Sequence, residues 1–254
     1  MSEATSDSAA LAFSGCGILL DIEGTTSSVR YVHDVLFPFV RRELDGFLAA
    51  HWTDAAVVQA CERMAMDAGA ASLDAFAAGH DPRAKIKAEV ARLMDGDVKA
   101  TGLKDLQGQI WEHGFRSGEL RAHVYPDVPP ALAAWNAAGI DVRIYSSGSI
   151  AAQKLFFAHS EAGDLLHHFR GHFDTTTGPK KSAGSYRAIA AAMQLPPAEI
   201  LFLSDIQAEL HAAREAGMGT GLSVRPGNAP ESPVMHPTIT NFSQIILRPT
   251  HNPA

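Results

Sequence analysis

Two carboxylates stand two residues apart where an apolar run ends. Asp21 and Glu23 follow Ile18–Leu20 and precede Gly24. Acidic side chains that leave a strand together can share a divalent cation, and one can attack a phosphorus atom while the other transfers a proton. Acidic residues ahead of glycine also simply close turns. The loop therefore gains a chemical meaning only from what the rest of the chain places beside it.

Groups suited to a phosphate follow two later segments. The serine- and glycine-containing segment Ser146–Ser149 stands at the predicted start of a helix, where backbone N–H groups and the positive end of the helix dipole favour an anion. Lys180 or Lys181, ahead of another predicted helix, adds a positive charge. Serine and glycine are also ordinary capping residues, and a lysine pair in a loop is usually a solvated surface feature.

A further acidic pair lies late in the chain. Asp205 ends another apolar run, and Glu209 follows four residues later in a predicted helix. Asp205 can join Asp21 on one cation, whereas Glu209 could hold Asp205, a ligand water or Lys180 in place. A Mg²⁺ site with several carboxylates and a phosphate needs another positive charge, which favours a role for one of the two lysines.

Strands and helices alternate along most of the chain. Short apolar runs that end in polar or glycine-containing residues predict buried parallel strands. Capped amphipathic segments between them predict helices. The pattern predicts an α/β fold with a doubly wound parallel sheet, whose carboxyl edge gathers the polar loops. The predicted strands are Gly17–Leu20, Val142–Tyr145, Ile200–Leu203 and Leu222–Val224. The predicted helices are one that starts after Asp127, Ile150–Ala158 after Ser149, Tyr186–Met193 with Ser182 or Ser185 as its cap, and Ile206–Ala216, which stops at Gly217.

Residues 32–121 break this alternation. They form amphipathic patterns without a convincing strand. We predict an inserted all-helical cap that lies over the sheet edge as a lid, with a separate helical domain elsewhere as the alternative. Residues 14–31 and 122–254 would form the catalytic core, and residues 1–13 a disordered tail. The predicted cap helices are Val35–Leu48, Ala55–Ala68, Arg83–Asp95 and Leu103–Ser117.

Composition excludes several classes of partner. The formal net charge is -7, and the lysines and arginines are scattered, so no basic stripe suits nucleic acid. Cys16 and Cys61 form no CxxC pair, and the histidines lack metal-ligand spacing. Met1–Ala10 lack the basic segment and long apolar stretch that are typical of a signal peptide, and no apolar run approaches the ~20 residues of a membrane span. We expect a soluble, cytoplasmic protein that binds neither nucleic acid nor membrane.

The order and the residues of these motifs resemble those of a known family. The succession of acidic, Ser/Gly, lysine and Ser-Asp segments is similar to that of the haloacid dehalogenase (HAD) superfamily. The residues within these motifs resemble those of its enolase-phosphatases (acireductone synthases) of methionine salvage. Glu23, where most of the superfamily has Asp, is a mark of this subfamily. The resemblance covers about Ile18 to Ile245. The segments that carry it are Ile18–Thr26, Leu36–Pro38, Leu106–Gly108, Ile144–Ser149, Gln153–Leu155, His172–Thr175 with Gly178 and Lys180, Ile200–Asp205 and Val224–Asn228.

The resemblance implies a reaction as well as a HAD-like fold. It implies a monomeric enzyme with one Mg²⁺ per chain that acts on a small phosphorylated diketone. The substrate would be 2,3-diketo-5-methylthiopentyl-1-phosphate, which is first enolised and then hydrolysed to 1,2-dihydroxy-3-keto-5-methylthiopentene (acireductone) and phosphate.

Roles for single residues follow by position in the resemblance. Asp21 would be the nucleophile and a metal ligand, and Glu23 the proton-transferring partner, a metal contact and the first candidate for the enolisation base. Asp205 would be a further metal ligand. Lys180 rather than Lys181 falls two residues after the family's glycine. Ser146, Ser147 and Lys180 would bind the phosphate.

Two other functions use the same residues. A phosphatase or phosphomutase of the superfamily could act on another small phosphate ester, in which case the helical insert would determine the substrate. A catalytically idle phosphate-binding or regulatory module is the third possibility. The presence of both Asp21 and Asp205 disfavours it.

Overall fold

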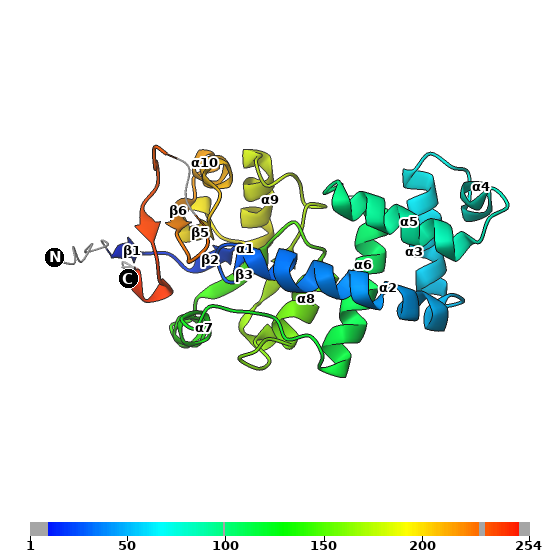
Figure 1. Cartoon of the computed structure of the whole chain (residues 1–254). Helices are drawn as coiled ribbons and strands as arrows, with labels where there is room; N and C mark the ends of the chain where they lie inside the picture. Colours follow the sequence, from blue (N-terminus) through cyan, green and yellow to red (C-terminus); the bar gives the residue numbers. More distant parts are fainter. Residues whose placement is uncertain (1–9, 99, 229–231, 249–254) are drawn as a thin grey trace. The chain divides into compact units, whose positions relative to one another are not determined.

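The structure, a computed structural model, describes residues 10–98, 100–228 and 232–248. They form two compact units: the described residues of Met1–Val29 with Arg121–Ala254, and Arg30–Leu120. The first unit combines a parallel sheet with helices, and the second consists of helices (Figure 1). The predicted fold class, a doubly wound parallel sheet of HAD-like type, is confirmed. Where the helical unit lies relative to the sheet stays a prediction.

Within the described ranges, six parallel strands form the sheet, in the order β4-β3-β2-β5-β6-β7. The first predicted strand is β2 residue for residue, while β6 begins three residues before its predicted start. Gly221 lowers the strand propensity there, yet a Cβ at this position would lie 2.7 Å from Leu203, so close packing requires glycine. The short edge strands β4 and β7 lack an apolar run and were not predicted. The bounds are β2 Gly17–Leu20, β3 Asp141–Tyr145, β4 Gly171–Phe173, β5 Ile200–Ser204, β6 Gly219–Ser223 and β7 Thr238–Ile239.

The register brings three loops to one edge. Leu20 pairs with Ile144 of β3 on one side and with Leu203 of β5 on the other. The residues that follow these strands therefore leave the sheet at its carboxyl edge, side by side. Asp21 belongs to the central one of these loops.

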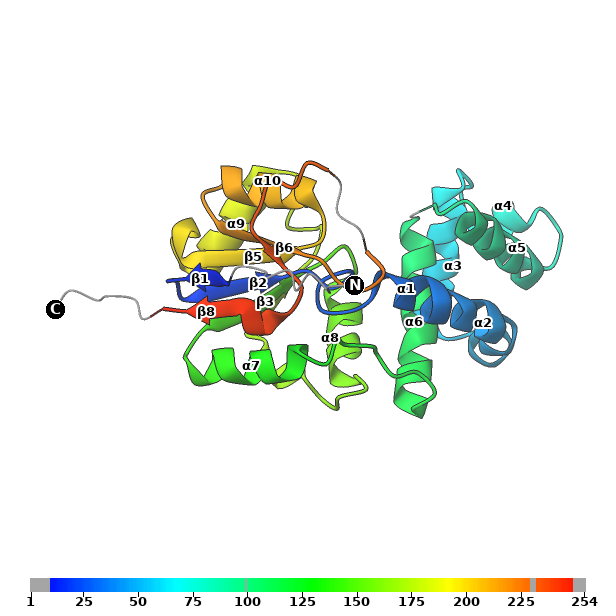
Figure 2. The same cartoon turned by 60° about the vertical axis from the view of Figure 1, so that its left-hand side comes forward.

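Helices cover both faces of the sheet. Figure 2 shows α7 and α8 on one side of the strands and α9 and α10 on the other. The predicted helices are present. Ser149 caps α8 by accepting from the Ala152 N–H at 3.3 Å, whereas Ser182 precedes α9 without such a bond. The bounds are α7 Val128–Ala137, α8 Ile150–Ala158, α9 Ala183–Met193 and α10 Gln207–Glu215, with 3₁₀ turns at Leu166–His168, Pro197–Glu199 and Phe242–Gln244.

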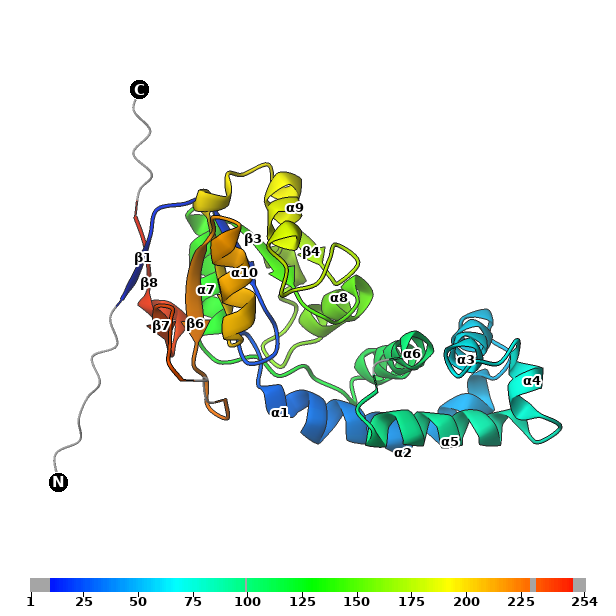
Figure 3. The ribbon, with the colours of Figure 1, turned by 90° about the horizontal axis from the view of Figure 1, so that it is seen from above.

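The start of the chain contains a strand that the sequence did not predict. β1 (Leu11–Phe13) pairs in parallel with β8 (Ile245–Leu247), as Figure 3 shows, and the Arg248 N–H donates to the Phe13 carbonyl at 2.7 Å. The prediction of a disordered tail over residues 1–13 is therefore wrong for residues 11–13. Their partner lies at the far end of the chain, so no local pattern indicates the pairing. Residues 1–9 lie outside the described ranges.

The second unit contains the predicted helices and two further features. Pro38 cannot donate the N–H that a continuous α-helix needs, and a π-helical turn precedes α2. α4 is too short for a helical period to show in the sequence. No helix of the described residues is long and apolar enough to cross a membrane. The bounds are α1 Val29–Tyr31, the π turn Val32–Leu36, α2 Phe37–His51, α3 Ala55–Asp67, α4 Leu73–Ala77, α5 Pro82–Asp95 and α6 Thr101–Ser117.

Candidate active site

Asp21 directly follows β2 in the sequence, and its side chain is buried. Its Oδ1 accepts from the Ile22 N–H at 2.8 Å and lies 2.8 Å from Lys180 Nζ. Its Oδ2 lies 3.2 Å from Ser204 Oγ, which can donate to it. Both carboxylate oxygens therefore have partners that fix the side chain at the strand end.

Lys180 connects the loop of Asp21 to helix α10. Its ammonium also lies 2.7 Å from Glu209 Oε2, and the lysine side chain is only 9% exposed. Burial alone would lower the pKa of this ammonium, but the carboxylates of Asp21 and Glu209 outweigh burial and raise that pKa. Lys180 is therefore charged. Lys181 is exposed, so the structure brings only the first lysine of the pair to the carboxylates.

Asp205 lies against the acidic loop. A Cβ at Gly24 would be 2.1 Å from Asp205 Oδ2, so only glycine lets this carboxylate approach the loop so closely. Asn228 Nδ2 donates to the Gly24 carbonyl at 3.0 Å and to Asp205 Oδ2 at 3.4 Å. Burial and, after it, the charge of Asp21 raise the pKa of Asp205 to about 7. The two carboxylates thus repel each other across the loop.

The charges at this edge fit a divalent cation. Asp21, Asp205 and Glu209 bring three carboxylates, whereas Lys180 brings one ammonium. Burial, with the charge of Asp21, also raises the pKa of Glu209 to about 7. No cluster of three or more His, Cys, Asp or Glu that could hold a metal occurs among the described residues. Two carboxylates are nevertheless a sufficient donor set for Mg²⁺, which keeps several waters and also binds substrate phosphate.

Glu23 lies on the outside of a tight loop. The N–H groups of Thr25, Thr26 and Ser27 all donate to the Ile22 carbonyl, at 3.2, 3.0 and 2.9 Å. This turn buries the threonines and leaves the Glu23 side chain exposed. Glu23 is therefore accessible to a substrate, one residue before the glycine that contacts Asp205.

The predicted phosphate loop differs from expectation in its donors. The Ile150 and Ala152 N–H groups at the start of α8 donate to Asp174 at 3.2 Å and to Ser149 at 3.3 Å. Two N–H groups at this helix end thus already have acceptors, one of them Asp174 from the neighbouring loop. Of the two predicted phosphate-binding serines, Ser146 is buried and Ser147 is exposed.

Buried Gln153 holds this loop in place. Its Nε2 donates to the carbonyls of Gly148 and Phe173, both at 2.8 Å. The amide therefore joins the Ser/Gly loop to the end of β4. The sequence pattern did not indicate this contact, because a lone glutamine in a helix usually faces solvent.

A buried arginine fixes the acidic loop from the far side. Arg225 donates from Nε to the Thr25 carbonyl at 3.0 Å and pairs with Asp127 at 2.8 Å. Its guanidinium lies between the rings of Tyr125 and Phe242, 4.7 and 4.4 Å from their centroids. Asp127 occupies the predicted capping position of α7, but its carboxylate binds this arginine instead of the helix. Residues about a hundred positions apart carry no local signal of such a pair.

Comparisons with known proteins agree with this geometry. A family model for haloacid dehalogenase-like hydrolases matches residues 17–217. The chain is 46% identical over 230 residues to Enolase-phosphatase E1 of Pseudomonas aeruginosa (strain LESB58), covering 91% of this chain and 97% of that protein. It is 47% identical over 231 residues to Enolase-phosphatase E1 of Synechococcus elongatus, covering 90% and 96%.

A solved structure extends the similarity to three dimensions. The UTR4 protein of Saccharomyces cerevisiae is 33% identical and superposes with a TM-score of 0.74, covering 90% of this chain and 99% of the yeast chain. Similarity therefore extends over nearly the whole chain, the helical unit included. The chain belongs to the haloacid dehalogenase-like hydrolases and, within them, to the enolase-phosphatases.

Proposed function

We propose that this chain is an enolase-phosphatase that converts 2,3-diketo-5-methylthiopentyl-1-phosphate to acireductone and phosphate in methionine salvage. The observation that carries this function is the buried contact of Lys180 with Asp21, at 2.8 Å, on the edge that also holds Asp205. Near full-length similarity to relatives named Enolase-phosphatase E1 narrows the substrate.

Asp21 would act as the nucleophile in phosphoryl transfer. Its carboxylate oxygen bonds to phosphorus while the ester P–O bond breaks, and Glu23 gives a proton to the leaving oxygen. The oxygen of a water then bonds to phosphorus while the bond from phosphorus to the Asp21 oxygen breaks, and Glu23 takes the water's proton. This step frees phosphate and the Asp21 carboxylate. Lys180 stabilises the charge that collects on the phosphate oxygens during both steps, with the hydroxyls of Ser146 and Ser147 as hydrogen-bond donors.

Enolisation would precede hydrolysis. A base removes a proton from the carbon next to a carbonyl, and the carbonyl oxygen gains a proton to give the enol. Glu23 is the first candidate for the base, since its side chain is exposed at the carboxyl edge of the sheet.

One Mg²⁺ per chain completes the proposal. Asp21 and Asp205 would hold it with their carboxylates and Glu23 would be a further contact, with waters and the substrate as the other ligands. When bound, the cation offsets negative charge on the phosphate and on the enolate oxygens.

The helical unit Arg30–Leu120 would select the substrate and exclude water from the enol. The unit begins at Arg30, nine residues after Asp21, so its start is close to the nucleophile in the sequence. A monomeric enzyme in the cytoplasm is the form that the family resemblance favours.

One assay tests the whole proposal. The purified protein is given the diketone phosphate with Mg²⁺, and phosphate release and the absorbance of the enediol are followed together. We expect both signals, and loss of both when EDTA removes the cation. Phosphate release without the enediol would identify a phosphatase for another ester. Absence of both signals from the folded, Mg²⁺-supplied protein would contradict the enzyme assignment.

A further inference from the structure

Three consecutive carbonyls of the lysine loop each accept from a buried side-chain hydroxyl. Tyr145 Oη donates to the Gly178 carbonyl at 2.9 Å, Ser185 Oγ to that of Pro179 at 2.8 Å, and Tyr186 Oη to that of Lys180 at 2.7 Å. Tyr145 ends β3, while the other two donors belong to the first turns of α9. The loop that carries Lys180 is thus fastened, carbonyl by carbonyl, to two elements of the core.

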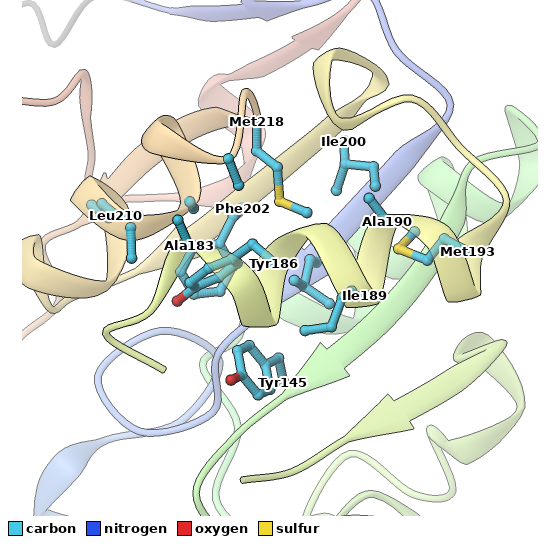
Figure 4. Packing of buried hydrophobic residues seen from close by; sticks show 14 of the residues in the cluster. Tyr145, Ala183, Tyr186, Ile189, Ala190, Met193, Ile200, Phe202, Leu210 and Met218 are labelled. Carbon is cyan, nitrogen blue, oxygen red and sulfur yellow. The ribbon is translucent and has the colours of Figure 1, made fainter. Parts of the chain in front are cut away.

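The donors themselves cannot move easily. Both tyrosines are fully buried and Ser185 is 4% exposed. The two phenol rings meet edge to face at 5.5 Å, and Tyr186 also packs on Phe202 at 5.0 Å. Figure 4 shows Tyr145 and Tyr186 within one apolar cluster between α9 and the sheet. A hydroxyl buried in such surroundings is costly to leave without an acceptor, so these bonds stay formed.

Both tyrosines remain donors throughout the working pH range. Burial raises the pKa of the Tyr145 and Tyr186 phenols, because the phenolate would have to leave water. Each phenol therefore keeps the proton that it donates.

Gly178 shows how closely the loop sits on these donors. Its φ is +147°, a value that L side chains rarely adopt, and a Cβ there would lie 2.3 Å from Ser185 Oγ. Only glycine allows the loop to lie against the start of α9 in this conformation.

We propose that Tyr145, Ser185 and Tyr186 form a hydroxyl clamp that positions Lys180 for the bound phosphate. The clamp rests on the proposed function in one respect, that Lys180 contacts the phosphate. With its backbone fixed, the lysine delivers its ammonium 2.8 Å from Asp21 and 2.7 Å from Glu209. Hydroxyls that served stability alone could use any acceptor, whereas these three all bind the one loop that carries the cation.

Removal of single hydroxyls tests the clamp. Tyr186→Phe and Ser185→Ala keep the side-chain shape and delete one donor each. Ser160→Ala is the matched control, since Ser160 is also buried and donates from Oγ to the Gly163 carbonyl at 2.6 Å, away from the lysine loop. The readouts are kcat/KM for 4-nitrophenyl phosphate and the inhibition constant of inorganic phosphate.

We expect each single clamp variant to lower kcat/KM about tenfold and the triple variant with Tyr145→Phe about a hundredfold, the loss expected from a displacement of about 1 Å. The affinity for inorganic phosphate should fall in parallel. The Ser160→Ala enzyme should stay within about twofold of the parent, as surface or remote changes do. Parent activity in the folded triple variant would overturn the proposal.

A double-mutant cycle separates positioning from mere stability. In a Lys180→Ala enzyme, Tyr186→Phe should cause no further loss of turnover, because the residue through which it acts is gone. Losses that simply multiply would show that the phenol acts elsewhere. If Tyr186→Phe does not fold, Tyr145→Phe and Ser185→Ala carry the same cycle, and failure of all three to fold would contradict a positioning role. The generic ester keeps this outcome independent of the diketone: the cycle can close even if no acireductone is formed.

Discussion

At the scale of single residues, the site brings together more negative than positive side chains. Asp21, Asp205 and Glu209 are buried or half-buried acids at one sheet edge, and Lys180 is the cation that contacts two of them. The acids at Asp205 and Glu209 respond with raised pKa values, because burial and the charge of Asp21 disfavour their ionised forms. Such an arrangement favours a further cation, whose positive charge would in turn favour an anionic substrate.

Asp21→Asn should remove phosphate release while leaving the fold intact. The amide is nearly isosteric but is not a nucleophile, so we expect phosphate release to fall by more than about a thousandfold. The metal-free variant should melt close to the parent, because Lys180 keeps its contact with Glu209 and the change removes the repulsion of Asp21 with Asp205 and Glu209. Phosphate release and circular dichroism melting are the measurements. Turnover near the parent rate by folded Asp21→Asn would rule out the covalent mechanism.

Lys180→Ala should be far more damaging than Lys181→Ala. The first change leaves two buried carboxylates without their partner, which costs on the order of 3 kcal/mol of stability in addition to the lost phosphate contact. Lys181 is exposed, and its replacement should change stability by less than about 0.5 kcal/mol. Urea unfolding and phosphate release compare the two. Equal, mild effects would show that Lys180 is not part of the site.

At the scale of elements, the turn after β6 holds the acidic loop. Arg225 binds the Thr25 carbonyl, and Asn228 binds both the Gly24 carbonyl and Asp205. The turn after β6 thereby joins the loops that follow the neighbouring strands β2 and β5. Partners that orient a ligand carboxylate commonly change metal affinity when they are removed.

Asn228→Ala should therefore weaken Mg²⁺ binding about 10- to 100-fold, because Asp205 loses the amide that orients it. The measurement is the Mg²⁺ concentration that gives half-maximal phosphate release. Asn136→Ala is the control, since Asn136 lies on α7 and makes comparable bonds to His168, away from the site. An unchanged Mg²⁺ requirement in Asn228→Ala would show that Asp205 is held without this turn.

Acid should destabilise the packing of β6 against the segment before β7. His236 Nδ1 lies 2.9 Å from Thr220 Oγ1, and burial, then Arg214 and His211, lower the pKa of His236 from 6.5 to about 4. A depressed histidine pKa means that the unfolded chain takes up the proton first. The stability that neutral His236 contributes to the folded protein is complete above about pH 6.5 and is lost as the pH falls towards 4.

His236→Asn should flatten the dependence of the melting temperature on pH between 6.5 and 4. Some slope should remain, because burial also lowers the pKa of His172 to about 4. Exposed His80 supplies the control: His80→Asn should leave the parent slope unchanged. A His236→Asn slope as steep as the parent's would mean that this histidine is not held neutral by the fold.

At the scale of the whole molecule, the chain is two compact units joined at Val29–Arg30 and Leu120–Arg121. Within the α/β unit, hydrogen bonds join the segment before the insert to the segment after it. The Tyr125 N–H donates to the Thr26 carbonyl at 3.0 Å, and the Ser28 N–H donates to His123 Nδ1 at 3.1 Å. The two chain segments that lead to the insert therefore run side by side. A short linker can join them without strain.

Replacing Arg30–Leu120 by a short Gly/Ser linker should separate the two half-reactions. We expect no acireductone, because the enol would be exposed to water, and weak Mg²⁺-dependent hydrolysis of 4-nitrophenyl phosphate by the remaining sheet loops. Circular dichroism confirms that the sheet unit is folded. Acireductone formation at the full rate would show that the helical unit neither selects the substrate nor shields the intermediate.

The sequence by itself determined the elements and the order of their polar loops. Hydrophobic periodicity, together with capping and turn residues, located the strand Gly17–Leu20, the helix Ile150–Ala158 with its Ser149 cap, and the helical insert. Since the carboxyl ends of parallel strands share one edge, this local reading was enough to bring Asp21, Asp205 and a lysine loop together. Family resemblance, rather than spacing, selected Lys180 over its neighbour.

Tertiary structure alone decided which side chains meet across long stretches of chain. The pairing of Leu11–Phe13 with Ile245–Leu247, the Arg225–Asp127 ion pair and the hydroxyls that hold the lysine loop have no counterpart in local pattern. Periodicity reports whether a residue is buried but not what it is buried against. The partners of a buried polar group are fixed by packing, because only the folded chain brings a donor and an acceptor from distant segments into one dry site.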